Sequence, residues 1–343
     1  MKLGSVYGVL RNTHLDLPIP LIHGFSRYIT AMHRHQNQPF TTEVSSRSVF
    51  YYADRSSRQW IKRKTDGYIT TAGDLLVEIK DPLRLSSTEE QQLRQHLATN
   101  NFVFYQYRPD AHYSASGYQH ICARLGLVNT VSNPVADAND ISRIQVRDNS
   151  HDKEYIPYTD RALKWHTDGY YNTANNQVNA FVLHCIRNAQ SGGSNSFLDH
   201  ELAYLLLLQQ NPRWVDALSS RDVMTIPANM SGATTIRTAY SGPVFDFSGK
   251  KPSIYMRFTE RQHNIVWKDD DEVQDALSAL RKILHQDNPW KIEILLEPGQ
   301  GVISNNVLHR RDAFQDNHHA ESKRCLDRIR FHDRVEENMA VSI

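Results

Sequence analysis

From residue 141 onward the chain is a series of short, strand-like apolar segments separated by turn signals. The segments expected to be strands are 141–147, 180–187, 244–247, 254–258, 292–296, 301–304 and 325–331. Gly and Pro mark turns at 191–193, 248–250 and 297–299. Two segments with helical periodicity, 202–210 and 271–285, interrupt the series. This pattern favours a mostly β, α+β fold whose core is a double-sheet jelly roll, or double-stranded β-helix, with helices packed outside.

The part of the chain before residue 141 contains a capped helix and one clear strand. Ser86 to Glu90 predicts a helix that runs to Thr99, because a hydroxyl can cap the free amides and early acids suit the helix dipole. A strand at 102–107 and a helix at 115–125 follow, whereas 48–52 and 75–79 are weaker strand signals. We expect an N-terminal extension over 1–85, contributing to a lid or to contacts in a homo-oligomer, and a jelly-roll domain over 86–343.

Composition excludes several classes of protein. Hydrophobic residues make up 40% and charged residues 22% of the 343 residues, which is typical of a folded globular chain. Lys and Arg total 39 against 38 Asp and Glu, so no net field attracts nucleic acid or an acidic membrane surface. No window has the ~20 apolar residues that a membrane span needs, and the start lacks the apolar run of a secretory signal. Three widely spaced cysteines fit a reducing compartment, so we expect a cytoplasmic protein.

The residues that point to chemistry are His166 and Asp168 in the segment 165–169, together with His309, 141 residues after Asp168. Two imidazoles and one carboxylate on one face of a metal form the facial triad of iron(II) oxygenases. Residues two apart on a strand point to the same side, which explains the spacing. His-x-Asp also occurs at 14–16 and 285–287, so the spacing alone is weak. The strand before the central copy, the turn after it and the later strand that contains His309 favour this copy.

Arginines after His309 supply the second part of the pattern. An iron oxygenase needs a two-electron reductant, and 2-oxoglutarate in that role requires a cation for its distal carboxylate. Arg324, Arg328 and Arg330 follow His309 by 15, 19 and 21 residues and share one face if the segment is a strand. One arginine is expected to hold 2-oxoglutarate and a second one the substrate. The alternative is that they form surface ion pairs with nearby acids.

Together these residues resemble the taurine dioxygenase and clavaminate synthase superfamily of iron(II)/2-oxoglutarate enzymes, and within it the glutarate 2-hydroxylase branch. The resemblance runs from about residue 85 to 331. It is carried by segments 144–149, 165–171, 192–196, 242–246 and 304–314, and by the arginine-x-x-x-arginine pattern within 323–328. Arg310 departs from the branch, which usually has glycine there, and the first 85 residues do not obviously match.

The resemblance implies roles for individual residues. It implies iron ligation by His166, Asp168 and His309, binding of the 2-oxoglutarate carboxylate by Arg324, and an Arg328 that faces the substrate or shares the anion. A hydroxyl residue after the paired glycines touches 2-oxoglutarate in the family, and two residues compete for that place, Asn195 and Ser196. The turn after the metal motif often contacts substrate, which makes Tyr170, Tyr171 and Asn172 candidates, although ordinary packing explains them equally well.

The expected activity follows from the resemblance. The chain would use Fe(II), 2-oxoglutarate and O2 to hydroxylate an unactivated C–H bond of a small carboxylate or amino-acid-like metabolite, releasing succinate and CO2. Two alternatives use the same three ligands: a zinc-type metallohydrolase and a non-catalytic metal-binding sensor on the same barrel. No sequence feature separates hydroxylation from desaturation or ring closure.

Overall fold

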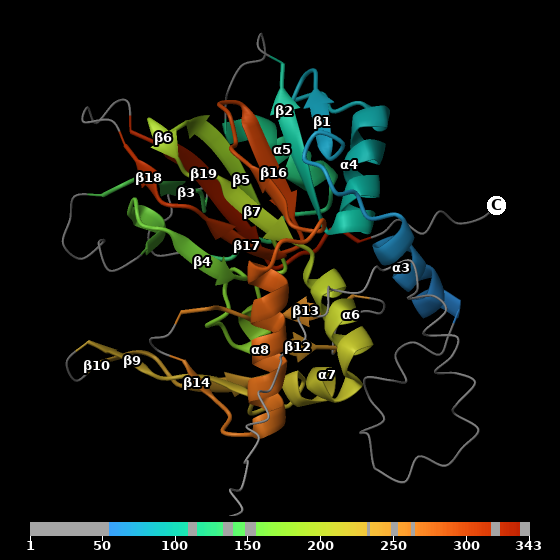
Figure 1. Cartoon of the computed structure of the whole chain (residues 1–343). Coiled ribbons are helices and arrows are strands. Elements are labelled where there is room, and N and C mark those ends of the chain that lie inside the picture. The colour runs from blue at the N-terminus through green and yellow to red at the C-terminus, as the bar shows by residue number, and fades with distance from the viewer. Residues whose placement is uncertain are drawn as a thin grey trace, which may run out of the picture.

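Two β-sheets form the centre of the protein. The structure is a computed structural model that describes residues 55–108, 115–132, 140–147, 156–231, 234–247, 253–261, 265–316 and 323–336 (Figure 1). The larger sheet has the strand order β1 (Leu76–Ile79), β2 (Phe102–Tyr107), β16 (Gln300–Ser304), β5 (Ala180–Arg187), β19 (Cys325–Phe331) and β3 (Ser142–Ile144). The smaller sheet has the order β15 (Ile292–Ile294), β7 (Asn195–Leu198), β17 (Leu308–Arg311) and β4 (Leu163–His166). Neighbouring strands are antiparallel, except that β1 and β2 are parallel.

An apolar core joins the two sheets. Phe102 and Phe104 of β2 and Phe197 of β7 are fully buried, and the ring centroids of Phe102 and Phe197 lie 5.4 Å apart. Leu183 and Leu326 belong to the same cluster. Since side chains alternate along a strand, one face of each sheet is committed to this core. The predicted two-sheet jelly roll with outer helices is therefore confirmed.

Two helices cover the opposite face of the larger sheet. Helix α4 (Ser87–Asn100) begins at Ser86, whose side chain accepts a hydrogen bond from the Glu89 amide in a capping box, as the sequence predicts. Helix α5 (Ala115–Arg124) also lies where it was predicted. Leu93 of α4 and Ile121 of α5 join the apolar cluster on this face of the sheet. The helices thus bury the side of the sheet that does not face the second sheet.

Three further helices form a second layer beside the barrel (Figure 1). They are α6 (His200–Gln210), α7 (Pro212–Leu218) and α8 (Asp271–His285), and α7 contacts both of the others. The short strands outside the two main sheets are β6 (Ser191–Gly192), β8 (Met224–Ile226), β9 (Asn229–Ser231), β10 (Thr234–Arg237), β11 (Tyr240–Gly242), β12 (Phe245–Asp246), β13 (Tyr255–Met256), β14 (Val266–Trp267) and β18 (Phe314–Gln315). Single 3₁₀ turns occur at Ile156–Tyr158 and Ala174–Asn176. Strands were expected at 244–247 and 254–258, and there β12 and β13 pair only with each other, outside the barrel.

Residues 55–85 are continuous with the barrel. Strand β1 pairs with β2, and helix α3 (Arg55–Asp66) buries Trp60 in the core formed with α6 and α8. Lys64 is only 1% exposed and its Nζ lies 2.8 Å from Asp199 and 3.1 Å from Glu201. The strand expected at 48–52 lies outside the described residues. In the described part of the chain, no helix combines the length and the apolar character needed to cross a bilayer.

Candidate metal centre

Three side chains that can bind a metal converge at one end of the smaller sheet. His166 ends β4 and His309 lies on the adjacent strand β17, where the two residues are direct cross-strand partners. Asp168 follows two residues after His166. One ligand atom from each of the three lies within 4.8 Å of the others, and His166 Nε2 is 3.7 Å from Asp168 Oδ1. Among the residues that the structure describes, no other trio of His, Cys, Asp or Glu is arranged in this way.

Both imidazoles are oriented for metal binding. The Nδ1 atom of His166 lies 2.9 Å from the carbonyl oxygen of Lys164, and that of His309 lies 2.9 Å from the carbonyl oxygen of Val307. An Nδ1–H that donates to a carbonyl leaves the lone pair on Nε2, as in most metal-bound histidines. Burial, together with the nearby His309, lowers the pKa of His166 to about 3, and burial also lowers the pKa of His309. Both rings are therefore neutral near neutral pH.

The carboxylate of Asp168 is ionised and incompletely satisfied. Burial raises its pKa, but Arg328, His309 and Arg330 outweigh that effect and hold the pKa well below its usual range. Arg328 Nη1 lies 3.3 Å from each carboxylate oxygen. Oδ2 is nevertheless buried and has no well-oriented hydrogen bond to any residue that the structure describes. A buried, orphaned carboxylate oxygen beside two neutral imidazoles fits a divalent cation.

The turn that contains Asp168 is held by close packing and by one amide side chain. Gly169 has a φ of 68°, and a Cβ at this position would lie 2.5 Å from Val178 Cγ2. The Asn306 amide accepts a hydrogen bond from the Asp168 backbone N–H at 2.8 Å and donates one to the Asp168 carbonyl at 2.9 Å. Asn306 lies within the family-like segment 304–314, but the sequence alone predicts no role for it. The available signal was an Asn beside a ligand-bearing strand, since Asn tolerates positive φ.

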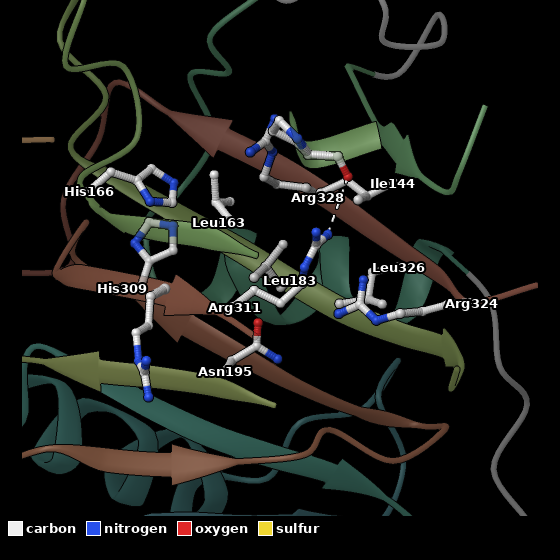
Figure 2. A pocket seen from close by; sticks show the side chains of 12 residues that line it. Ile144, Leu163, His166, Leu183, Asn195, His309, Arg311, Arg324, Leu326 and Arg328 are labelled. Carbon is white, nitrogen blue, oxygen red and sulfur yellow. Dashed lines mark hydrogen bonds between the residues drawn. The ribbon is translucent and has the colours of Figure 1, made fainter. Parts of the chain in front are cut away.

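A cavity extends from the two histidines along the inside of the barrel (Figure 2). It holds about 430 Å³ of space, part of it open to solvent. Its wall is formed by Ile144, Pro157, Leu163, His166, Leu183, Asn195, His309, Arg310, Arg311, Arg324, Leu326 and Arg328. In Figure 2 the imidazoles lie at one end and Arg324 lies at the other, with Leu183 between them. The cavity thus connects a metal site to a distant cation across an apolar wall.

The two arginines at the far end have different partners. Arg324 is 5% exposed, and within the described residues its guanidinium makes no hydrogen bond and stacks over Phe314 at 5.0 Å. Burial lowers the pKa of Arg324. Arg311, which sequence reasoning did not assign, donates to the backbone carbonyls of Pro157, Thr159 and Arg161. Its alternation with His309 on one strand was the signal that was missed. Of these two arginines, Arg324 is therefore the one whose guanidinium makes no hydrogen bond to the described residues.

Arg328 and Arg330 lie near the metal end. They are on β19, opposite Leu183 and Phe181 of β5 respectively, and the Phe181 ring centroid is 4.7 Å from that of His309. Arg328 contacts Asp168, as described above. In the described residues the guanidinium of Arg330 makes one hydrogen bond, at 3.1 Å to the Tyr171 hydroxyl. The strand face predicted to carry the three arginines thus places two of them beside the metal ligands.

Asn195 and Ser196 point in different directions. Asn195 lines the cavity, and its Nδ2 donates to the Gly193 carbonyl at 3.4 Å. Ser196 does not line the cavity, and its hydroxyl accepts a hydrogen bond from Arg310 Nε at 3.1 Å. Adjacent residues on a strand face opposite sides, which accounts for the difference. Of the two competing positions, the structure brings only Asn195 to the cavity.

The turn residues Tyr170, Tyr171 and Asn172 lie beside the metal motif but do not line this cavity. The Tyr170 hydroxyl accepts a hydrogen bond from Arg261 at 3.4 Å, and Tyr171 accepts one from Arg330. Asn172 makes local bonds, including one from its Nδ2 to the Asn176 carbonyl at 2.8 Å. Tyr171 is therefore the member of the three with a direct link to the arginines near the metal.

Solved structures share this fold at low sequence identity. An asparagine oxygenase in complex with Fe(II), 2S,3S-3-hydroxyasparagine and succinate has a TM-score of 0.53 and 15% identity, covering 72% of this chain and 80% of that one. The non-haem iron oxygenase OrfP with Fe and α-ketoglutaric acid has a TM-score of 0.54 and 16% identity, covering 73% and 81%. PvcB, an Fe, α-ketoglutarate dependent oxygenase from an isonitrile synthetic pathway, has a TM-score of 0.51 and 16% identity, covering 77% and 88%.

Curated proteins and family models give different results. No curated protein matches this chain. A family model described as "Taurine catabolism dioxygenase TauD, TfdA family" matches residues 63–326, which is well over half of the sequence. The superfamily resemblance found in the sequence is thereby confirmed, whereas its glutarate 2-hydroxylase branch stays a prediction. The chain belongs to the TauD/TfdA family and is a 2-oxoglutarate-dependent dioxygenase that uses Fe(II).

Proposed function

We propose that His166, Asp168 and His309 bind the Fe(II), that Arg324 binds the distal carboxylate of 2-oxoglutarate, and that the enzyme hydroxylates an unactivated C–H bond of a small carboxylate or amino-acid-like metabolite. Succinate and CO2 are the co-products. The observation that supports this most directly is one cavity that reaches two ligands of the metal triad, His166 and His309, at one end and the buried Arg324 guanidinium, which makes no hydrogen bond to the described residues, at the other.

The chain's own residues suit both ends of 2-oxoglutarate. Two neutral imidazoles and one carboxylate leave coordination positions open for a bidentate keto acid. Arg324 offers the planar, paired donors that a carboxylate prefers, and its burial strengthens that interaction. Leu183 and Leu326 lie along the cavity between them and exclude water from the carbon chain. When bound, Fe(II) with 2-oxoglutarate supplies the oxidising chemistry that no side chain provides.

Positive charge near the metal supports an anionic substrate. Among the described residues, the Arg328 guanidinium pairs with Asp168 alone, and that of Arg330 donates only to the Tyr171 hydroxyl. A buried guanidinium such as that of Arg330 is costly unless it is paired with an acid, so an acidic group of the substrate would satisfy it. The related fold of an asparagine oxygenase and the OrfP complex with (3S)-hydroxy-L-Arg are consistent with an amino-acid-sized substrate.

The test begins with anaerobic titration of the purified protein with Fe(II) and 2-oxoglutarate. A weak visible charge-transfer band is expected from the wild type and not from His309→Ala. Admission of O2 with a panel of small carboxylates and amino acids should then release succinate, and mass spectrometry should show one added oxygen in the product. Succinate release that never depends on a panel compound would remove the proposed substrate class.

The zinc-hydrolase and sensor alternatives predict other results. A hydrolase would turn over without 2-oxoglutarate and would not respond to loss of Arg324. A sensor would bind the metal and 2-oxoglutarate but would form no succinate. An absent charge-transfer band in folded, iron-loaded protein would refute the proposed ligand set.

A further inference from the structure

Asn306 connects the two segments that contain the metal ligands. It lies in the turn between β16 and β17, three residues before His309, and it is 3% exposed with a φ of 54°. Its Oδ1 accepts a hydrogen bond from the Asp168 N–H at 2.8 Å. Its Nδ2 donates to the carbonyl of Asp168 at 2.9 Å and to that of Val178 at 2.6 Å. One side chain thus binds both backbone polar groups of the acidic ligand.

Sheet pairing does not by itself hold Asp168 in place. His166 and His309 are cross-strand partners, so the ladder between β4 and β17 fixes their separation. Strand β4 ends at His166, and Asp168 lies two residues beyond it. A residue past the end of a strand needs other partners for its backbone groups. The Asn306 amide supplies them from the turn that leads into His309.

The turn that contains Asn306 is itself firmly anchored. The preceding Asn305 donates from its backbone N–H to the Asn101 carbonyl at 2.7 Å, and its amide exchanges hydrogen bonds with the backbone of Val335 at 3.0 and 3.1 Å. Asn101 in turn donates to Asp199 at 2.9 Å and accepts from Arg334 at 2.7 Å. Asn101, Asn305 and Val335 are buried and hold the turn in place. Asn306 is therefore fixed independently of the segment that contains Asp168, and its hydrogen bonds hold the Asp168 backbone.

We infer that Asn306 is a positioning residue that keeps the Asp168 carboxylate aimed at the metal position and prevents a closer ion pair with Arg328. The inference rests on the proposed ligand set. Arg328 Nη1 already lies 3.3 Å from both carboxylate oxygens and attracts them. If the backbone of Asp168 relaxed, a closer ion pair with Arg328 would compete with the metal for the same oxygens. Groups that orient a ligand in this way typically contribute roughly 10- to 100-fold to metal affinity.

The test compares two buried asparagines that bind backbone in the same manner. Asn306→Gly removes the amide without backbone strain, because glycine tolerates a positive φ. Asn100→Ala is the matched control, since the Asn100 amide bonds the N–H and the carbonyl of Ile69 at 3.2 and 2.8 Å, and Ile69 is not a proposed ligand. The dissociation constant of Co(II) as a spectroscopic probe, the Fe(II) dissociation constant and the denaturation midpoint of the metal-free protein are measured for each.

Both variants are expected to be less stable than the wild type, but only Asn306→Gly should bind Co(II) and Fe(II) more weakly, by roughly 10- to 100-fold. Asn306→Asp, which keeps the acceptor for the Asp168 N–H, should lie between the two and serves in place of Asn306→Gly if that variant does not fold. The inference would be overturned if the Asn306 variant bound Co(II) and Fe(II) as tightly as the wild type. It would also be overturned if Asn100→Ala lost as much metal affinity as the Asn306 variant. Failure of the wild type to bind either metal would instead refute the proposed ligand set.

Discussion

Replacing Arg324 by glutamine is expected to weaken 2-oxoglutarate binding without lowering the stability of the free protein. In the described residues the guanidinium makes no hydrogen bond and is buried, so the metal-free protein loses no polar contact in the variant. Removing a buried, uncompensated charge is neutral or stabilising. Loss of one partner from a buried charged pair costs about 2–5 kcal/mol, which corresponds to roughly a 30- to 5000-fold rise in the dissociation constant of 2-oxoglutarate.

The assay pairs 2-oxoglutarate titration with chemical denaturation of the ligand-free protein. Arg311→Gln is the matched control, because Arg311 is buried on the same cavity wall but donates to the carbonyls of Pro157, Thr159 and Arg161. Burial and the neighbouring Arg324 lower the pKa of Arg311 to about 9. The control should lose stability, since three backbone carbonyls lose their donor and that of Thr159 is buried.

Opposite outcomes would refute the reasoning about the far end of the cavity. If Arg324→Gln bound 2-oxoglutarate within a few-fold of the wild type, the distal carboxylate would have another partner. If Arg324→Gln unfolded more easily than Arg311→Gln, the guanidinium would be structural. Either result would refute the role of Arg324 but not that of the three metal ligands. Metal titration of the same variants tests the metal ligands directly.

Three further changes test the metal end and the fold. Gly169→Ala is expected to cost about 2–4 kcal/mol of stability and to weaken metal binding. The reason is that the added Cβ would lie 2.5 Å from Val178 Cγ2, at a residue with positive φ. Chemical denaturation measures the loss of stability, and metal titration measures the loss of affinity. Arg330→Gln should raise the KM of an anionic substrate and change 2-oxoglutarate affinity less than about twofold, since its partner is Tyr171; equal effects on both would contradict this. Burial lowers the pKa of His184 to about 4, below the unfolded value of about 6.5. The stability that the neutral ring contributes is therefore fully present above about pH 6.5 and is lost as the pH falls toward 4. His184→Gln should flatten this part of the pH profile of stability measured by urea denaturation.

Sequence prediction succeeded where local patterns determine structure. Helix α8 has the predicted bounds because its apolar residues follow the helical period, and α4 begins at the predicted Ser86 cap. Strands β2, β5 and β19 also occupy their predicted residues. The His-x-Asp motif and the distant His309 converge because β4 and β17 pair in antiparallel register, and strand patterns together with the family resemblance anticipated that convergence.

The features that the sequence did not predict, helix α3 and the role of Asn306, depend on partners that are distant in the chain. Helix α3 is basic and has no acid in its first turn, so its sequence gives little helical signal. It is held by Trp60 and Lys64, which bond to carboxylates of Glu201 and Asp199, more than 130 residues later. Asn306 likewise gives only a weak local signal, an Asn beside a ligand-bearing strand, because its partner Asp168 lies 138 residues away. Sequence periodicity contains no information about such pairs.

The order of Arg324, just before β19, and Arg328, within it, bears on which of the two is proposed to bind the co-substrate. Arg328 contacts Asp168, so it stands beside the metal. Arg324 precedes it by four residues, which on a strand is about 13 Å, somewhat less because the ladder is irregular between Cys325 and Leu326. If 2-oxoglutarate chelates the metal as proposed, its second carboxylate would need a cation further from Asp168, and Arg324 lies in that direction along the cavity. Arg328, beside Asp168, is then the arginine proposed to face a group of the substrate near the metal.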